Sequence, residues 1–390
     1  MSTLLRSLKA YLPAIALLLS INSAFAQHYN QTNLVSNTGA APTNDPNLQN
    51  AWGLVSGPAV GGGAGTPWWV SNNAGGTSTL YSITVAGGKV TANIVPINGN
   101  GIVTVPNAPS QQAPGSPTGV MFTGSKTDFI LPSGLPARFI FVTEDGTVQG
   151  WAGGAATTIV VDNSQSPNAA DGAVYKGSTI AEIDGKKFIL AANFRSGKVD
   201  VFNSSFKQVK LSSGDDDDRE AFVDERIPDG FAPFNIQGVG PNIYVTYAKQ
   251  DAARHDPVGG AGLGFVDVFN SHGRLLQRLE HGFWMNAPWG VVWATPGFGE
   301  FSNTILVGQF RGGTIAAFNP VTGAFLGNVL RPDGTTLTID GLWALRFGND
   351  GTSGPATTLF FTAGPNGEKD GLLGILSPVA SPEGVEADEQ

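Results

Sequence analysis

The chain is built from short stretches in which apolar and polar residues alternate. Two clear examples are "GKVDVFN" (Gly197–Asn203) and "GFVDVFN" (Gly264–Asn270). A period of two places alternate side chains on opposite faces of a β-strand, and 53 glycines and 25 prolines supply turns between strands. Beyond the first residues, no window shows the 3.6-residue period of an amphipathic helix. The pattern predicts an all-β protein.

One apolar phrase returns along the chain and marks a repeat. Its instances are "NAWGLV" (Asn50–Val55), "SPTGVMF" (Ser116–Phe122), "APFNIQGV" (Ala232–Val239), "NAPWGVVW" (Asn286–Trp293) and "DGLWALRF" (Asp340–Phe347). A second apolar strand, a turn and a third strand follow each of them. With a further unit over Ser178–Asn203, the chain contains six units. Their corresponding positions fall near Gly53, Gly119, Ile180, Ile236, Gly290 and Leu342.

Six such units predict a six-bladed β-propeller with four-stranded blades. Their spacing is typical of blades that carry loop insertions. Greek-key connections of a sandwich would not accommodate six similar units, and a β-helix has a much shorter repeat. The last unit supplies three clear strands, so we expect the N-terminal strand "YNQTNLVSN" (Tyr29–Asn37) to complete that blade and close the ring. Residues 27–379 would then be a single domain.

Several long phrases carry a resemblance to known proteins. The segment 287–327 resembles the repeat of NHL-type propellers. The phrases "FVTEDGTVQGW", "APFNIQGVGPNIYVTYAKQD", "NAPWGVVWATPGFGEFSNTILVGQFRGG" and "FTAGPNGEKDGLLG" are similar to those of an uncharacterised family of exported proteins, known from bacteria and from a giant virus. That resemblance implies a propeller fold and export. The family has no established activity, so the resemblance leaves function open.

The first 26 residues have the pattern of a secretory signal peptide. Arg6 and Lys9 precede an apolar run, and "SAFA" (Ser23–Ala26) supplies a cleavage site, so we expect cleavage after Ala26. The alternative is a membrane anchor, but the run is shorter than a spanning helix needs. We therefore expect a periplasmic or secreted protein without a membrane span. The acidic tail 380–390 is expected to be disordered.

Charge and composition exclude several classes of function. The net charge is −9 and the pI is about 4.9, which argues against nucleic acid as a partner. The absence of cysteine removes thiol catalysis and zinc-thiolate sites. No nucleophile elbow, zinc-protease motif or phosphate loop occurs. We expect a monomer whose partner is a small molecule, a peptide or a glycan.

Two sets of positions should meet at one end of the propeller channel: the starts of the innermost strands, and the turns between second and third strands. They are Asn50, Thr118, Asn235 and Asp340 in the first set and Asn72, Asn73, Glu144, Asp145, Asn193, Arg195, Tyr247, Gln309, Arg311 and Glu368 in the second. From these turns and the aromatic residues beside them we predict a ligand-binding group. It consists of Glu144, Phe194, Arg195, Tyr247, Phe310, Arg311 and Glu368.

The same positions could hold a metal ion. Asn50, Asn235, Asp340 and Glu144 carry the hard oxygen ligands that Ca²⁺ prefers. Alternatively, these side chains cap turns and join neighbouring blades through local hydrogen bonds. Among the aromatic residues, we expect Trp52 and Trp289 to lie in the core and Phe194 and Phe310 to be exposed.

Two function hypotheses follow from these positions. The first is a binding scaffold that acts through the channel mouth, favoured by the missing catalytic motifs. The second is a Ca²⁺-dependent hydrolase or lyase of the lactonase type, by analogy of fold. His255, in a long insertion, could overhang the mouth as an acid or base, although an exposed loop histidine is the common case. The acidic run 215–218 is expected to be a solvated loop.

Overall fold

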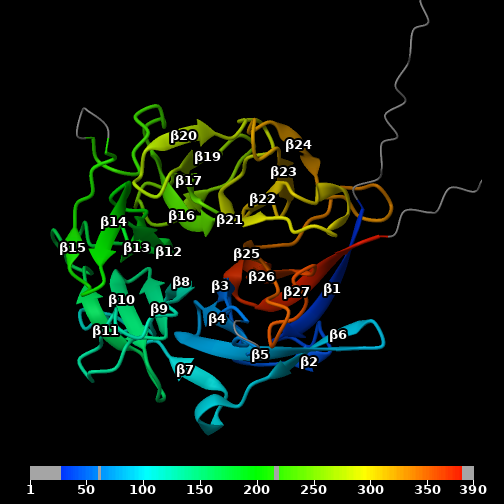
Figure 1. Ribbon diagram of the computed structural model, residues 1–390, viewed down its shortest axis with the longest axis horizontal. Coiled ribbons are helices and arrows are strands. Elements are labelled where there is room, and N and C mark those ends of the chain that lie inside the picture. The colour runs from blue at the N-terminus through cyan, green and yellow to red at the C-terminus, as the bar shows by residue number, and fades with distance from the viewer. Residues whose placement is uncertain (1–27, 60–62, 215–218, 380–390) are drawn as a thin grey trace, which may run out of the picture.

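Six β-sheets are arranged radially around a common axis in the computed structural model of the protein, which describes residues 28–59, 63–214 and 219–379 (Figure 1). The predicted signal peptide, the acidic run 215–218 and the tail 380–390 lie outside these residues. The chain passes through the sheets in order around the ring, as the colours of Figure 1 show. The predicted six-bladed β-propeller is therefore confirmed.

Each blade consists of antiparallel strands numbered outward from the axis. Blade 1 contains β3 (Ala51–Val55), β4 (Trp68–Asn72), β5 (Thr77–Ala86) and β6 (Lys89–Ile94), with β7 (Ile102–Thr104) paired to β5. Blade 2 contains β8 (Pro117–Phe122), β9 (Phe139–Thr143), β10 (Thr147–Trp151) and β11 (Thr158–Asp162). Blade 3 contains β12 (Tyr175–Ile183), β13 (Lys186–Asn193), β14 (Lys198–Asn203) and β15 (Gln208–Val209).

The second half of the ring follows the same plan. Blade 4 contains β16 (Phe231–Val239), β17 (Asn242–Gln250), β19 (Gly264–Phe269) and β20 (Leu275–Arg278), with β18 (Pro257–Val258) paired to β17. Blade 5 contains β21 (Pro288–Trp293), β22 (Ile305–Gln309), β23 (Ile315–Phe318) and β24 (Phe325–Asn328). Three short helical turns complete the described elements: η1 (Ile97–Gly99), η2 (Gly299–Phe301) and α1 (Pro365–Glu368).

Blade 6 joins the two ends of the chain. Its inner strands are β25 (Leu342–Phe347), β26 (Leu359–Ala363) and β27 (Leu372–Pro378), and β1 (Tyr29–Ser36) pairs antiparallel with β27. The short β2 (Thr43–Asn44) then extends the sheet at its edge. The N-terminal strand closes the ring, as the sequence predicted, and β27 is left with no open edge.

All six innermost strands contain a β-bulge at the same place. In each, the register with the second strand shifts by one residue near the start of the strand. The first bulged residue is Trp52, Thr118, Lys176, Phe234, Trp289 or Trp343, and the next is Gly53, Gly119, Gly177, Asn235, Gly290 or Ala344. A β-bulge changes the direction of the side chain at the position where it occurs. These bulges define the true alignment of the repeat.

The bulges correct the alignment predicted for three units. In the third, the equivalent of Gly53 is Gly177, three residues before the predicted Ile180, and β12 begins at Tyr175 instead of Ser178. In the fourth and sixth, the equivalents are Asn235 and Ala344 instead of Ile236 and Leu342. The recurring phrase also has a backbone explanation. Asn50, Ala287 and Gly341 have φ angles of 46°, 52° and 64°, and each stands two residues before a bulged tryptophan. The left-handed residue turns the chain into the innermost strand.

Aromatic side chains fill the centre of the ring. This aromatic plug consists of Trp52, Phe194, Phe234, Trp289, Phe310 and Trp343, each at most 4% exposed. Trp343 stacks on Trp52 with 3.6 Å between ring centroids and on Phe310 with 3.8 Å. The plug divides the axial channel into two ends. It also confirms that Trp52 and Trp289 are core residues.

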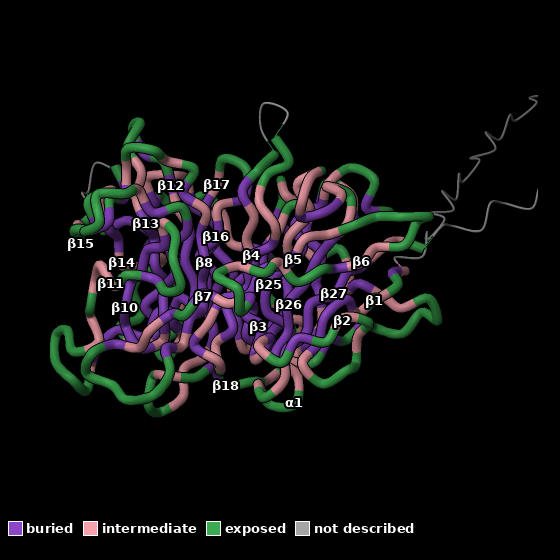
Figure 2. The backbone as a smooth tube through the Cα atoms, turned by 90° about the horizontal axis from the view of Figure 1, so that it is seen from below, coloured by how far each residue is buried: buried purple, intermediate pink, exposed green. Residues whose placement is uncertain are grey.

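The two faces of the disc are unlike. Seen edge-on, α1 and β18 lie on the same face (Figure 2). This face, where the innermost strands begin, is called the mouth below. Within the part of the chain that the structure describes, no helix has the length and apolar character of a membrane span.

Glycine after the bulge allows neighbouring innermost strands to approach closely. A Cβ atom at Gly290 would lie 2.5 Å from the carbonyl oxygen of Trp343 and 3.0 Å from the amide nitrogen of Leu345. Both atoms belong to the backbone of the next blade, so neither can move aside cheaply. Gly238, elsewhere in an innermost strand, is different, because its nearest neighbour would be 3.4 Å away.

We therefore expect Gly290→Val to lower the free energy of unfolding by about 3 kcal/mol or to prevent folding, because the side chain would push two blades apart. Gly238→Ala is the matched control and should change stability by less than about 1 kcal/mol. Urea unfolding followed by tryptophan fluorescence measures both. Equal stability of Gly290→Val and the native protein would contradict the packing described here.

Candidate functional site

A buried lysine lies at the centre of the mouth. Lys176 is the bulged residue of blade 3, at the position that holds tryptophan in three other blades, and it is 1% exposed. Its ammonium contacts Glu144 Oε1 and lies 3.1 Å from Asp256 Oδ1. It also lies 5.4 Å from the ring centroid of Trp52 in the plug, close enough for a cation–π contact.

The two carboxylates keep Lys176 protonated. Burial lowers the pKa of its ammonium, but Glu144 and Asp256 raise the pKa by more, so the net pKa lies above its ordinary value. A protonated amine has no free electron pair and cannot act as a nucleophile. Lys176 therefore contributes a fixed positive charge and hydrogen-bond donors.

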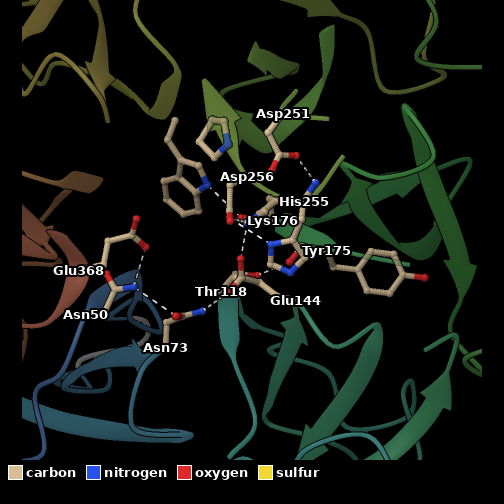
Figure 3. Close-up of polar contacts among 12 residues, drawn as sticks. Asn50, Asn73, Thr118, Glu144, Tyr175, Lys176, Asp251, His255, Asp256 and Glu368 are labelled. Atoms are coloured by element: carbon tan, nitrogen blue, oxygen red, sulfur yellow. Dashed lines mark hydrogen bonds and ion pairs between the residues drawn. The ribbon is translucent and has the colours of Figure 1, made fainter. Parts of the chain in front are cut away.

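A chain of hydrogen bonds extends from Glu144 around the mouth (Figure 3). Glu144 Oε2 accepts a hydrogen bond of 2.7 Å from Asn73, in the turn after β4. Asn50 Nδ2 donates to both Asn73 Oδ1 and Glu368 Oε2, each at 3.1 Å. We call Glu368, Asn50, Asn73, Glu144, Lys176, Asp256 and His255 the mouth network. Its members come from blades 6, 1, 2, 3 and 4.

Glu368 is held toward this network by an unusual backbone. Asn366, Gly367 and Glu368 are consecutive residues with φ angles of 57°, 63° and 69°. Left-handed conformations of non-glycine residues are costly and gather at functional sites. Burial, and then the nearby Glu144 carboxylate, raise the pKa of Glu368, while Lys176 and Arg311 oppose this rise. Glu368 therefore favours its neutral form more than an exposed glutamate does.

An insertion of blade 4 crosses the mouth opposite Glu368. Asp256 in this insertion contacts Lys176, and the adjacent His255 has Nδ1 at 3.1 Å from Asp256 Oδ1. The hydrogen bond from His255, together with Lys176, holds the pKa of Asp256 well below its usual range. The side chain of His255 is 37% exposed, and one of its ring nitrogens lies within 4.8 Å of carboxylate oxygens of Glu144 and Asp256, so His255 lies at the mouth.

Arg311 completes the mouth from blade 5. Its Nε donates a hydrogen bond of 3.2 Å to the carbonyl oxygen of Pro257, and its guanidinium lies 4.7 Å from the ring centroid of Phe310. These contacts orient the side chain but leave both Nη atoms without a partner among the described residues. Arg311 is exposed and offers these donors to solvent.

One group at the mouth has the composition of a metal site. Single ligand atoms of Glu144, His255 and Asp256 lie within 4.8 Å of one another. The Lys176 ammonium contacts two of these three residues, so a divalent ion placed among them would have to displace it. The fit to Ca²⁺ is poor in a second respect, because Ca²⁺ prefers oxygen ligands and His255 offers nitrogen.

The predicted ligand-binding residues divide into three groups. Glu144, Glu368 and Arg311 lie at the mouth, and Arg195 is nearby, because its carbonyl accepts a 3.5 Å hydrogen bond from Arg254 in the blade 4 insertion. Phe194 and Phe310 were expected to be exposed, which is wrong: they are 0% and 3% exposed, because their turns fold inward onto the plug.

Tyr247 lies away from the mouth. Its ring packs in the apolar cluster between blades 3 and 4, and it lines a separate cavity of about 200 Å³ that also contacts Asp224 and Phe231. The side chain of Tyr247, in β17, points between blades 3 and 4 instead of toward the axis. Matching the repeat units in the sequence placed Tyr247 at the correct position along its strand, but it could not give the direction in which the side chain points.

The predicted calcium ligands are not gathered in one place. Asn50 already uses both side-chain atoms, since its Oδ1 accepts a hydrogen bond from the indole of Trp343. Asn235 donates to the carbonyl oxygen of Trp289 and lines a cavity beneath the plug. Asp340 is exposed and accepts a hydrogen bond from the amide of Asn366. Only Asn50 and Glu144 share the mouth network. These contacts correspond to the capping alternative.

Sequence reasoning missed Lys176, the central residue of the mouth. The third unit was aligned three residues too late, which left "YKG" (Tyr175–Gly177) outside the repeat. Alignment on the glycine after the bulge would have matched "KG" with "WG" of blades 1 and 5. A charged residue at a position that is aromatic in four other blades is the signal that was available.

Comparisons with known proteins support the fold and leave activity open. No protein-family model matches the chain. Uncharacterised protein R648 of Acanthamoeba polyphaga mimivirus is 29% identical over 356 residues, which cover 88% of this chain and 78% of that protein. Uncharacterised protein L690 of the same virus is 27% identical over 358 residues, covering 88% and 84%. The giant-virus resemblance is thus found, while the NHL-type likeness and export stay predictions.

A solved structure described as a glucose dehydrogenase is similar in shape. It aligns with a TM-score of 0.51 at 14% identity, covering 90% of this chain and all of that one. An identity this low shows a shared propeller fold and nothing about the reaction.

We expect Lys176→Met to lower the free energy of unfolding by about 3 kcal/mol, because Glu144 would lose its counter-ion in a largely buried site. Adding Glu144→Gln to this variant should recover most of the loss. Lys198→Met is the matched control: this lysine is 57% exposed and its partner Glu220 is 45% exposed, so the change should stay below about 1 kcal/mol. Urea unfolding measures all three.

By the same reasoning we expect Glu144→Ala to be destabilised, because Lys176 would lose the carboxylate that contacts its buried ammonium. If Lys176→Met and Glu144→Ala were both as stable as the native protein, the ion pair would have no structural role.

Proposed function

We propose that this protein is an exported binding scaffold whose ligand is a small polar molecule or glycan that carries a carboxylate. The observation that carries the proposal is the mouth network itself. It places a permanently charged ammonium and fixed hydrogen-bonding groups from five blades around one axis. Groups held in place before binding lose little conformational freedom when a ligand arrives. Export is proposed from the signal-peptide pattern of residues 1–26.

The chemical class of the ligand follows from the atoms that remain available. The Nη atoms of Arg311 form the free edge of a guanidinium, which suits a carboxylate in a bidentate pair. Glu368 uses Oε2 for Asn50 and has Oε1 available for a hydroxyl group. His255 uses Nδ1 for Asp256 and has Nε2 available. A molecule with a carboxylate and neighbouring hydroxyl groups, as in a sugar acid, would engage all three residues.

Three monosaccharides that differ in charge test this proposal: glucuronate, glucose and glucosamine. In saturation-transfer NMR we expect the native protein to bind glucuronate in preference to the other two. Arg311→Met should weaken glucuronate binding by about 30-fold, since a charge-assisted hydrogen bond contributes about 2 kcal/mol. Arg138→Met, at an exposed arginine just before β9, is the control and should bind as the native protein does.

Other results would revise the ligand or overturn the proposal. Preference for glucosamine would mean that the carboxylates of the mouth, and not Arg311, select the ligand. Binding of glucuronate that survives Arg311→Met would place the ligand elsewhere. If the native protein bound none of the three sugars, the sugar-acid class would be wrong.

A Ca²⁺-dependent hydrolase or lyase is the second candidate, favoured by the proximity of Glu144, His255 and Asp256. In that case a bound ion would stabilise the fold, and millimolar Ca²⁺ over a micromolar site would contribute roughly 4 kcal/mol. Because Lys176 stands among these groups, we expect the melting temperature of the native protein to be the same with Ca²⁺ and with chelator. A clear rise with Ca²⁺ that is lost in Glu144→Gln would favour the enzyme over the scaffold.

A further inference from the structure

A second polar cavity lies on the axis beneath the aromatic plug. It is lined by residues of all six innermost strands, including Gly53, Gly119, Ser178, Gln237, Gly290 and Arg346. These residues follow the bulged positions along their strands, so the cavity lies deeper in the channel than the mouth network. The volume of this cavity is about 10 Å³, counted as the space that the centre of a water-sized sphere can occupy. That is about the space needed by one water molecule or one small ion.

Arg346 brings a positive charge to this cavity without a counter-ion. The Nε atom donates a hydrogen bond of 3.2 Å to the carbonyl oxygen of Leu54 in the next blade. Arg346 forms no ion pair with a carboxylate of the described residues, and burial alone accounts for the lowering of its pKa, to about 10. Its guanidinium is thus charged at neutral pH, and its four Nη hydrogens have no protein acceptor among the described residues.

Another arginine of the ring shows the usual arrangement. Arg278, whose side chain is 22% exposed, pairs with Asp224 at 2.5 Å and with Asp267 at 2.8 Å. A charge that is partly removed from water is normally compensated in this way, because burial of an unpaired charge is unfavourable. Arg346 is half-buried, as Arg278 is, but it has no carboxylate partner among the described residues.

Ser178 is an independent sign of a ligand in the same cavity. It is 5% exposed, and its Oγ atom is buried without any hydrogen-bond partner. Most buried hydroxyl groups have a partner, and this Oγ lies beside the cavity, where it is available to donate a hydrogen bond to a ligand. The innermost strands are also the edge strands of their sheets, and edge strands offer unpaired backbone N–H groups.

We propose that this cavity binds a single small anion of the size of chloride between Arg346 and Ser178. An anion accepts hydrogen bonds from the guanidinium and from the hydroxyl, and it neutralises the charge that the fold leaves uncompensated. The size of the cavity selects a monoatomic ion over a sugar acid or a phosphate. The site is separated from the mouth by the aromatic plug and does not depend on the function proposed for the mouth.

Thermal and urea unfolding in chloride test the proposal when ionic strength is held constant with gluconate, which is too large for the cavity. We expect chloride to stabilise the native protein. Above the dissociation constant, each tenfold rise in chloride should multiply the folding equilibrium constant about tenfold. Arg346→Met should lose this dependence, and Ser178→Ala should shift it to higher chloride. Arg138→Met, which removes an exposed arginine, should keep it.

A crystallographic measurement covers the case in which Arg346→Met does not fold. Crystals of the native protein soaked in bromide should give an anomalous peak beneath the plug, beside Arg346 and Ser178. Equal stability of the native protein in chloride and gluconate, or a bromide-soaked crystal without that peak, would overturn the proposal. Chloride dependence that persists in Arg346→Met would also overturn it.

Discussion

The close approach of neighbouring innermost strands is the constraint on which the whole molecule depends. At Gly53 an added Cβ would lie 2.3 Å from the carbonyl oxygen of Thr118, and at Gly177 it would lie 2.1 Å from Asn235 Oδ1. At these positions only a residue without a side chain allows adjacent blades to meet, whereas blades 4 and 6 carry Asn235 and Ala344 at the equivalent place. Because the strands meet at that point, the bulged residues just before it converge on the axis. Four of them belong to the aromatic plug, and Lys176 lies at the centre of the mouth.

The composition of these converging positions gives the mouth its chemistry. Three tryptophans and a phenylalanine exclude water from the centre, and Lys176 adds one charge to the same ring of positions. An ammonium in this environment needs carboxylates, which Glu144 and Asp256 supply from two other blades. The remaining hydrogen bonds extend the arrangement to Asn50 and Glu368. The single charged residue in this ring of positions thus accounts for the organisation of the network around it.

The plug also makes the two ends of the axis independent. At the mouth, Lys176 is paired with Glu144 and Asp256, and the available hydrogen-bond donors of Arg311 face solvent. At the other end, Arg346 has no carboxylate and the space admits no more than one small particle. The two ends of the axis thus differ in size and in charge.

The sequence alone determined the β-strands, their grouping into six blades and the closure of the ring, because these depend on local periodicity, turn residues and the count of strands in the last unit. It also located Glu144, Glu368, Arg311 and His255 near the mouth, since strand starts and alternate turns share one face of any propeller. Tertiary structure alone decided which side chains point inward. Phe194 and Phe310 are buried, and Tyr247 points between blades, because direction depends on packing against residues far away in the chain. The role of Lys176 required the bulge, and the lack of a counter-ion at Arg346 became visible only when every neighbouring blade was in place.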